Sequence, residues 1–339
     1  MAFTVFPKIF FGRYVRSEQY NFSPGRTVYC TIEGFRGKLV VAERVDDEEG
    51  SKLVVSEMDP ETFSLSGRKT VWRRPDDYVY FGVIDSCVYR DRLWLTFTTA
   101  REWGTGLGCE DCWIFWVDPE TGEGGKPERV CDSNHSGCSN MTVWRDKVWI
   151  SYNAGSSWKG DSHLHLRSFD GSTFSEEYIL DGFSYVYHPY PAVFNGHLYI
   201  LFGETSKFGD DYGCDRIFVV EFDGEEFFNC RELYGVGRNA YPHAAEFDNR
   251  LFIFWKSTGK TYEKYGYDFQ DIAMVYIEKD GAVSNVEHLI EENTYNSGPV
   301  PTVFNDRLYV VYTKYTRYYH SKSGLSKWVG NWVVTLSRA

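Results

Sequence analysis

Long apolar runs are missing from this chain of 339 residues, and positive charge is in deficit. No uninterrupted apolar segment approaches the ~20 residues that a membrane-spanning helix needs, so membrane insertion is not expected. Lysine and arginine total 36 against 48 acidic residues, which gives a formal net charge of −12. A strongly acidic chain of this kind argues against nucleic acid as a partner.

A secretory leader is also missing from the amino-terminal segment. This segment reads Met-Ala-Phe-Thr-Val-Phe-Pro-Lys and has none of the basic, apolar and small-residue zones of a signal peptide. The sequence therefore leaves two compartments open, the cytoplasm and the outside of the cell for a mature secreted form. We expect a monomer.

What the chain has in abundance is a short pattern that occurs six times. Each copy consists of an aromatic residue, a polar turn and an aliphatic residue that opens a strand, and the copies start at Phe35, Tyr89, Trp144, Phe194, Phe247 and Phe304. A turn such as Arg-Asp or Asn-Gly between two alternating apolar runs predicts a β-hairpin. The regular recurrence indicates one supersecondary unit per repeat, which buries its apolar faces against its neighbours.

Each repeat continues with a third strand pattern and a weaker fourth one. In five copies the third pattern ends in an Asp-Pro or Asp-Gly turn, at Asp59, Asp118, Asp170, Asp223 and Asp280. We therefore predict an all-β chain that forms a six-bladed β-propeller of four-stranded antiparallel blades, as a single domain over residues 1–339. The blades are expected at roughly 26–75, 80–132, 138–181, 188–235, 241–291 and 299–339.

The sixth copy stops after its third strand, whereas the strand-like segment at about 3–15 precedes the first copy without a partner. We predict that this segment supplies the outer strand of blade 6, because closing the ring leaves no open sheet edge. An open solenoid of six repeats is the alternative, but the polar capping units that it requires are missing.

Loops at one end of the predicted propeller offer a place for a ligand. The connections between second and third strands, at 43–52, 98–111, 153–163, 203–216, 256–271 and 313–327, should gather around the axis. They carry Trp103 and Trp158, whose rings could stack on sugars, and Arg101 and Glu102, which could bind hydroxyls. An aromatic-lined protein-interaction surface would give the same pattern.

Four cysteines form a separate candidate site: Cys109, Cys112, Cys131 and Cys138. They lie in two loops that the repeat places at the same end of blade 2 and at its junction with blade 3. This arrangement would suit a structural zinc ion or two disulfides. No cofactor is expected to be required for function.

The first repeat carries a cluster of charged residues. Arg26 opens its inner strand, and Glu43-Arg44-Val-Asp46-Asp47 closes the next strand. Arginine can hold a carboxylate by paired donors, and nearby carboxyl groups can donate protons. A solvated loop or a calcium site would also explain an acidic segment.

The order and spacing of these residues resemble the first blade of sialidases and their relatives. Ser56-Glu-Met-Asp59-Pro-Glu-Thr-Phe63 likewise resembles a degraded copy of the Asp-box of that family. The resemblance implies a sialidase-like glycoside hydrolase in which Arg26 and Arg44 bind a substrate carboxylate, and Glu43, Asp46 or Asp47 act in catalysis. Arg238 and Arg317 are then candidates for further carboxylate-binding arginines.

A second group of candidates enters the inner strands of repeats 4 and 5. His188-Pro-Tyr190 and Tyr241-Pro-His243 should face the axis at the loop-rich end. Histidine and tyrosine together can abstract a proton next to a uronate carboxylate and protonate the leaving oxygen. The pattern is similar to the entrance motifs of propeller polysaccharide lyases, and three further residues could complete such a site: Glu204, Lys256 and Lys314. Alternatively, Tyr-Pro simply starts a strand and both histidines hydrogen-bond within the fold.

Three functions remain open at this point. The first is a carbohydrate-active enzyme, a hydrolase or a lyase, that acts on an acidic glycan. The second is a non-catalytic glycan-binding propeller, and the third is a protein-interaction module. The differing residues at the six strand entrances favour one central site over six equal ones.

Overall fold

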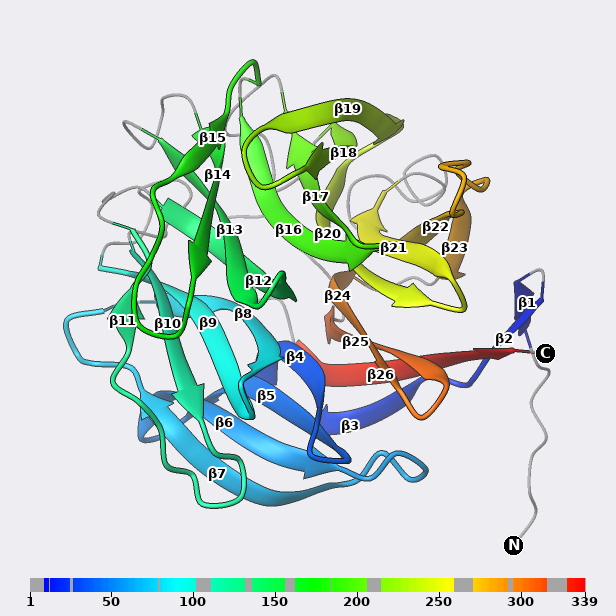
Figure 1. The fold of residues 1–339 in the computed structure, drawn as a ribbon. Coiled ribbons are helices and arrows are strands. Elements are labelled where there is room, and N and C mark those ends of the chain that lie inside the picture. The colour runs from blue at the N-terminus through cyan, green and yellow to red at the C-terminus, as the bar shows by residue number, and fades with distance from the viewer. Residues whose placement is uncertain are drawn as a thin grey trace, which may run out of the picture.

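The structure is a computed structural model that describes residues 9–11, 13–24, 27–78, 80–101, 111–131, 136–155, 162–183, 185–205, 215–258, 271–291, 295–315 and 328–338. Its elements are β-strands, arranged as six antiparallel sheets around a central axis (Figure 1). Within this part of the chain, no helix is long and apolar enough to cross a membrane. The predicted six-bladed, all-β propeller is confirmed.

Five blades follow the chain from the innermost strand outward. Blade 1 comprises β4 (Thr27–Phe35), β5 (Lys38–Asp47), β6 (Gly50–Met58) and β7 (Leu65–Arg73). Blade 2 comprises β8 (Tyr80–Tyr89), β9 (Arg92–Ala100), β10 (Asp111–Val117) and β11 (Glu128–Arg129). Blade 3 comprises β12 (Ser136–Trp144), β13 (Lys147–Gly155), β14 (Ser162–Phe169) and β15 (Tyr178–Leu180). Blade 4 comprises β16 (Val186–Phe194), β17 (His197–Glu204), β18 (Arg216–Phe222) and β19 (Phe227–Tyr234). Blade 5 comprises β20 (Asn239–Phe247), β21 (Arg250–Ser257), β22 (Asp271–Ile277) and β23 (Glu287–Ile290).

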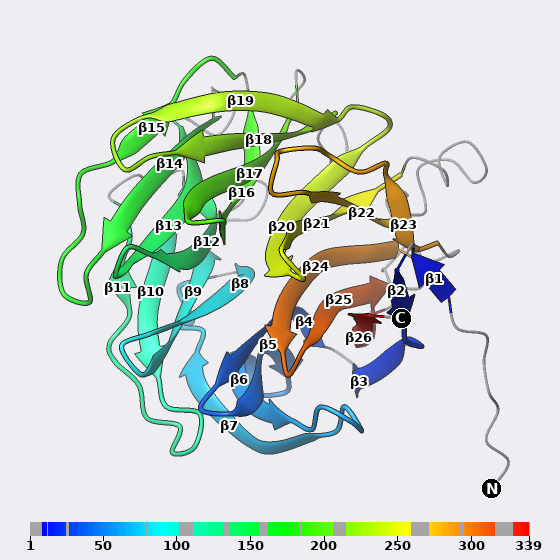
Figure 2. The same cartoon turned by 45° about the vertical axis from the view of Figure 1, so that its right-hand side comes forward.

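Blade 6 is built from both ends of the chain. Its inner strands are β24 (Tyr295–Phe304), β25 (Arg307–Tyr315) and β26 (Trp328–Arg338). Two amino-terminal strands, β2 (Tyr14–Arg16) and β3 (Tyr20–Pro24), pair with successive parts of β26, and β1 (Ile9–Phe11) pairs with β2. Figure 2 shows β2 beside the carboxyl end of the chain. The predicted closure of the ring is confirmed, and the closing segment extends beyond residue 15.

The turn at Asp248 of blade 5 fastens this closure. The Asp248 carboxylate accepts a hydrogen bond of 2.9 Å from the Tyr14 hydroxyl and forms an ion pair of 2.6 Å with Arg13. It also forms an ion pair with Arg338, close to the end of β26. One carboxylate thus holds both the amino-terminal strand and the last strand.

The hydrophobic core lies between the blades. Each innermost strand contacts the innermost strand of the next blade, and β24 contacts β4. One apolar cluster joins Val55 of blade 1 to Leu95 and Phe115 of blade 2, and another joins Leu201 of blade 4 to Trp255 of blade 5. Since each blade buries its faces against two neighbours, the ring depends on all six contacts.

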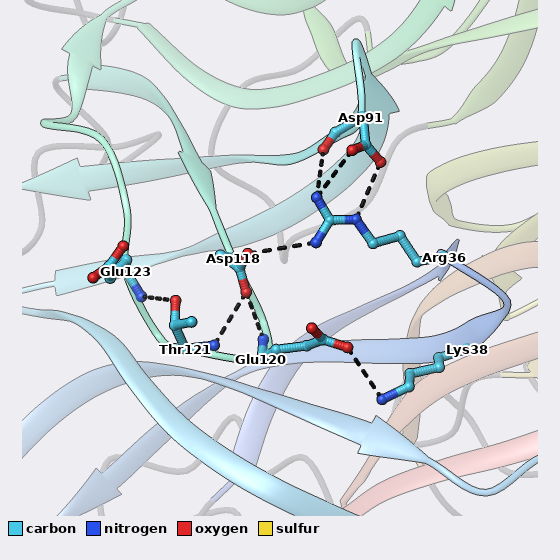
Figure 3. A network of polar contacts seen from close by, with 7 residues as sticks. All are labelled: Arg36, Lys38, Asp91, Asp118, Glu120, Thr121 and Glu123. Carbon is cyan, nitrogen blue, oxygen red and sulfur yellow. Dashed lines mark hydrogen bonds and ion pairs between the residues drawn. The ribbon is translucent and has the colours of Figure 1, made fainter.

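The repeated polar turns form as the sequence predicts. In all six hairpins both turn residues have positive φ, as in Arg90 (50°) and Asp91 (57°), which identifies primed turns. These turns also connect neighbouring blades. The Arg36 guanidinium of blade 1 donates to Asp91 at 3.0 Å and to Asp118 at 3.5 Å in blade 2, beside a contact of 3.4 Å between Lys38 and Glu120 (Figure 3).

Every innermost strand contains a β-bulge at the same place. The residues with positive φ at these bulges, from +47° to +63°, are Tyr29, Val83, Cys138, His188, Tyr241 and Gly298. For a residue other than glycine, this backbone conformation raises the free energy of the folded state by on the order of 1–3 kcal/mol. Because the bulge recurs in all six blades, it belongs to the architecture, whereas the residue type at each bulge differs from blade to blade.

The acidic segment of the first blade is not the long loop that its composition suggested. Residues 43–47 continue β5, and β6 begins at Gly50, so the connection is a tight turn. The prediction of a loop over residues 43–52 is therefore wrong. Glycine at position 50, with φ of 104°, allows the strand to reverse immediately.

Candidate functional site

A cluster of side chains from blades 3, 4 and 5 gathers at the bulges of the inner strands. The His188 and Tyr241 rings lie 3.7 Å apart between centroids. The Cys138 Sγ atom lies 3.6 Å from His188 Nε2, and the Lys256 Nζ atom lies 4.7 Å from the centre of the Tyr241 ring. We call these four residues, Cys138, His188, Tyr241 and Lys256, the axial cluster.

The strands explain why these side chains meet. Cys138, His188 and Tyr241 occupy the bulge positions of β12, β16 and β20, which are consecutive innermost strands. Proline follows both His188 and Tyr241. Proline has no N–H group to donate, and the bulge interrupts the ladder of backbone hydrogen bonds at this point. Proline therefore fits there without the loss of a hydrogen bond. A second pair, Tyr190 and His243, lies two residues further along, with ring centroids 4.6 Å apart.

Burial keeps both histidines neutral near neutral pH. His188 and His243 are 3% and 4% exposed. Desolvation lowers the pKa of His188 well below its usual range, and the nearby Lys256 ammonium adds to this effect. Desolvation also lowers the pKa of His243 to about 4. A neutral imidazole can accept a proton, and among the described residues His188 Nδ1 has no hydrogen-bond partner.

Two carboxyl groups on inner strands of blades 1 and 2, those of Glu33 and Asp85, were not among the candidates predicted from the sequence. Burial raises the pKa of Asp85 to about 7 and that of Glu33 to about 8. Asp85 Oδ2 accepts a hydrogen bond of 2.8 Å from the Met141 N–H of blade 3. If the repeats are aligned at their bulges, Asp85 takes the same position as Thr31, Asn140 and Tyr190 in the other inner strands. This alignment indicates a layer of polar side chains around the axis.

The raised pKa of Asp85 predicts a loss of stability in alkaline solution. A folded-state pKa above the unfolded value means that the native state favours the protonated carboxyl. Its stabilisation is present below an unfolded pKa of about 4 and is lost as the pH rises through the folded value. We expect Asp85→Asn to melt at least about 2 °C above the unsubstituted protein at about pH 8.5, and the gain to disappear at or below about pH 4.

Circular dichroism melts at both pH values would measure this difference. Asp59→Asn is the matched control, because backbone hydrogen bonds lower the pKa of that exposed carboxyl and its removal should bring no gain. An equal gain for Asp85→Asn at both pH values would contradict the expectation.

The charged cluster of the first blade is largely paired within itself. Arg44 donates two hydrogen bonds of 2.9 Å to the Asp46 carboxylate, and Asp47 forms an ion pair with Lys52. Glu43 is fully buried and accepts bonds of 3.1 Å each from three side chains: Ser23, Arg68 and Asn331. Glu43 therefore connects blade 1 to the two strands that close blade 6.

The other candidates are spread around the ring. Glu204 is paired with Arg216 at 2.8 Å, and Arg101 lies over the Tyr78 ring. Lys314 lies over the Trp332 ring, and the backbone of Arg238 exchanges hydrogen bonds with Thr258. Some candidates lie outside the described residues: Arg26, Cys109, Glu102, Trp103, Trp158 and Arg317.

Of the four cysteines predicted as a zinc or disulfide site, the three that the structure describes are reduced thiols in two different places. Cys112 and Cys131 are buried in one apolar cluster between blades 2 and 3, whereas Cys138 contacts His188 at the inner strands. No group of three histidine, cysteine or acidic residues in the described ranges could hold a metal ion. A zinc ion or disulfides that include Cys109 stay a prediction.

The fold has relatives among solved structures, although the chain matches no protein-family model and no curated protein sequence. Phage phi92 endosialidase aligns with a TM-score of 0.62 at 8% identity, over 94% of this chain and 68% of that one. Trypanosoma rangeli sialidase in complex with the inhibitor DANA aligns with a TM-score of 0.61 at 10% identity, over 92% of this chain and 55% of that one.

The chain has the sialidase-like six-bladed propeller fold. A thermostable family-43 glycoside hydrolase also aligns, with a TM-score of 0.51 and 13% identity over 76% of this chain and 89% of that one. At these identities the likeness concerns the fold alone. The chain spans about half the length of the trypanosomal sialidase.

Proposed function

We propose that the protein cleaves an acidic polysaccharide by β-elimination at the axial cluster. The observation that carries this proposal is the neutral, buried His188 imidazole in ring contact with Tyr241, beside the Lys256 ammonium. A base, a hydroxyl acid and a cation are the three groups needed to eliminate next to a uronate carboxylate. Glycan substrates are in keeping with a fold shared with glycoside hydrolases.

Each group has one role in the reaction. Lys256 pairs with the uronate carboxylate and so stabilises the negative charge that develops when the neighbouring carbon loses its proton. His188 accepts that proton, and the electron pair of the broken C–H bond forms a C=C bond. The C–O bond to the leaving sugar breaks, and the Tyr241 hydroxyl gives its proton to the departing oxygen. Solvent then restores both groups, and the cleavage itself consumes no water.

The partial exposure of the cluster suits this division of roles. Tyr241 is only partly buried, so it can meet a polymer, whereas His188 and Lys256 lie deeper. An ammonium group beside an aromatic ring, such as that of Lys256 over Tyr241, places positive charge where an anionic ligand can pair with it. Tyr190 and His243 contact each other two residues further along the same strands.

Incubation with a panel of uronate-containing polysaccharides tests the proposal. Cleavage should produce an unsaturated sugar end that absorbs in the ultraviolet. Lys256→Met is expected to raise KM by about 10-fold or more, because the variant keeps the side-chain length but loses the charge that binds the carboxylate. Lys147→Met, an exposed charge change at the first hairpin of blade 3, is the control and should leave KM unchanged.

Sialidase-like hydrolysis is a second candidate, and the contact between Arg44 and Asp46 favours it. Here a carboxylate substrate would displace Asp46 from Arg44, and the released carboxylate would take a proton from solvent and pass it to the leaving oxygen. Hydrolysis of a sialoside without ultraviolet absorbance, lost in Arg44→Ala, would support this function and contradict elimination. Binding of either glycan without cleavage would contradict both enzymes.

A further inference from the structure

A hydrogen bond within β20 links His243 to the bulge residue of its own strand. His243 Nδ1 lies 3.1 Å from the Tyr241 carbonyl oxygen. A carbonyl oxygen only accepts hydrogen bonds, so Nδ1 carries the hydrogen and is the donor. With the hydrogen on Nε2 instead, the Nδ1 lone pair would face the lone pairs of the carbonyl oxygen and be repelled by them. The carbonyl therefore fixes the tautomer of the neutral His243 ring.

This bond lies where the strand leaves its regular pairing. Tyr241 has a φ of 56°, and the register of β20 with β21 shifts between Ala240 and His243. The His243 backbone is back in register, opposite Phe254, so its ring donates from a fixed place. Because a residue with a side chain keeps a positive φ only where its surroundings support it, the bond helps to hold Tyr241 in the bulge.

Blade 3 has the same bond with a different donor. Asn140 follows the bulge residue Cys138 by two positions, and its amide donates to the Cys138 carbonyl at 3.2 Å. Val300 takes the equivalent place in blade 6, where the bulge residue is Gly298 and positive φ brings no strain. The chain therefore uses an amide where blade 5 uses an imidazole, so asparagine is expected to fit the place of His243 and to keep the bond.

The conformation of the bulge decides where the Tyr241 ring points. The ring centroid lies 3.7 Å from that of His188, and Lys256 Nζ lies 4.7 Å from it. A bulge redirects the side chain that it carries, so a return to regular pairing would turn the ring away from both neighbours. The His243 ring itself packs against Tyr190, with centroids 4.6 Å apart. His243 can thus act on the axial cluster through the Tyr241 backbone.

We propose that His243 is a positioning residue whose Nδ1–H bond to the Tyr241 carbonyl holds the Tyr241 hydroxyl where it protonates the leaving oxygen. The imidazole takes no part in the proton transfer. The kinetic consequence rests on the proposed elimination reaction. The tautomer and the placement of the Tyr241 ring do not, and both can be observed in the resting protein.

NMR of protein labelled in its histidine rings tests the bond without substrate. We expect nitrogen signals with hydrogen on Nδ1 for His243, assigned by their loss in His243→Asn. The Tyr241 ring current should displace the ring-proton signals of His188, which are assigned by their loss in His188→Asn. In His243→Ala these signals should move most of the way to their positions in Tyr241→Asn, which lacks the aromatic ring, whereas His243→Asn should leave them in place. Hydrogen on Nε2 of His243, or unmoved His188 signals in His243→Ala, would overturn the proposal.

The choice of leaving group separates a misplaced acid from general damage to the site. A departing sugar oxygen needs a proton, whereas nitrophenolate leaves as a stable anion and needs none. His243→Ala is expected to lower kcat on the polysaccharide by about 10- to 100-fold with KM unchanged, because Lys256 still binds the carboxylate. On a synthetic uronate with nitrophenolate at the eliminated position, the same variant should lose less than about 3-fold.

Two further variants complete the kinetic test. His243→Asn should recover most of the rate on the polysaccharide, because its amide can donate to the Tyr241 carbonyl. Val300→Ala removes a buried side chain at the equivalent place of blade 6 and should leave the ratio of the two rates unchanged. Equal losses on both substrates in His243→Ala, or no recovery in His243→Asn, would refute the positioning role. A protein that shows the expected NMR signals but cleaves neither substrate would refute the proposed function and leave the bond between His243 and Tyr241 standing.

Discussion

Replacing His188 by asparagine is expected to lower kcat for uronate cleavage by about 10³-fold or more, because general base catalysis contributes about that much. Asparagine tolerates the φ of 47° that His188 adopts and fills part of the same space, but its amide cannot accept a proton at neutral pH. KM should change little, since Lys256 still binds the carboxylate. Initial rates of ultraviolet absorbance measure the effect.

His197→Asn is the matched control for this substitution. His197 is an exposed residue at the start of β17, on the same blade, and its replacement should leave both kcat and the melting temperature unchanged. Retention of more than about a tenth of the activity by a folded His188→Asn protein would exclude His188 as the base, given the expected contribution of general base catalysis.

Removing the carboxylate of Glu43 is expected to reduce the free energy of unfolding by about 3 kcal/mol, because two buried donors and the exposed Arg68 guanidinium lose their acceptor at once. Asn331 belongs to β26, and Ser23 belongs to β3. Since these two strands close blade 6 against blade 1, Glu43→Ala weakens the junction on which the ring depends. Urea unfolding followed by tryptophan fluorescence would measure the change.

The size of this effect distinguishes a structural from a catalytic Glu43. Glu57→Ala removes a carboxylate of the neighbouring strand that is 44% exposed and paired with Lys38, so it should cost less than about 1 kcal/mol. If Glu43 is structural, the Glu43→Ala protein keeps its kcat well below its melting temperature. A stable protein with abolished catalysis would instead support the role that the sialidase resemblance implies.

The fold could be predicted from the sequence because its signals are local and repeated. Asp170 illustrates this: its carboxylate accepts hydrogen bonds from the Ser172 and Thr173 N–H groups, and the same turn recurs at Asp118 and Asp223. The primed hairpin turns are likewise set by two adjacent residues. Where the closing strand pairs with β26 could be predicted less well, because that pairing depends on residues more than 300 positions apart.

The candidate site was partly predictable for the same reason. His188 and Tyr241 occupy equivalent places in consecutive repeats, so a correct repeat alignment brings them together. The pairing of Arg44 with Asp46 was not foreseen, because a sequence does not show whether two nearby charges face each other or a ligand. The contact of Cys138 with His188 depends on the bulge of each strand, and the sequence carries no clear signal for this bulge.

The pairing of β3 with β26 has a consequence for how the protein is made. Blades 1 to 5 each consist of one continuous stretch of chain and can assemble as they leave the ribosome. Ser23, in contrast, can pair only after Asn331 has been synthesised, so β3 stays without its neighbouring strand while blades 1 to 5 are made. Contacts of such large sequence separation form slowly, and completion of blade 6 is therefore expected to limit the rate at which the newly made chain reaches its native state.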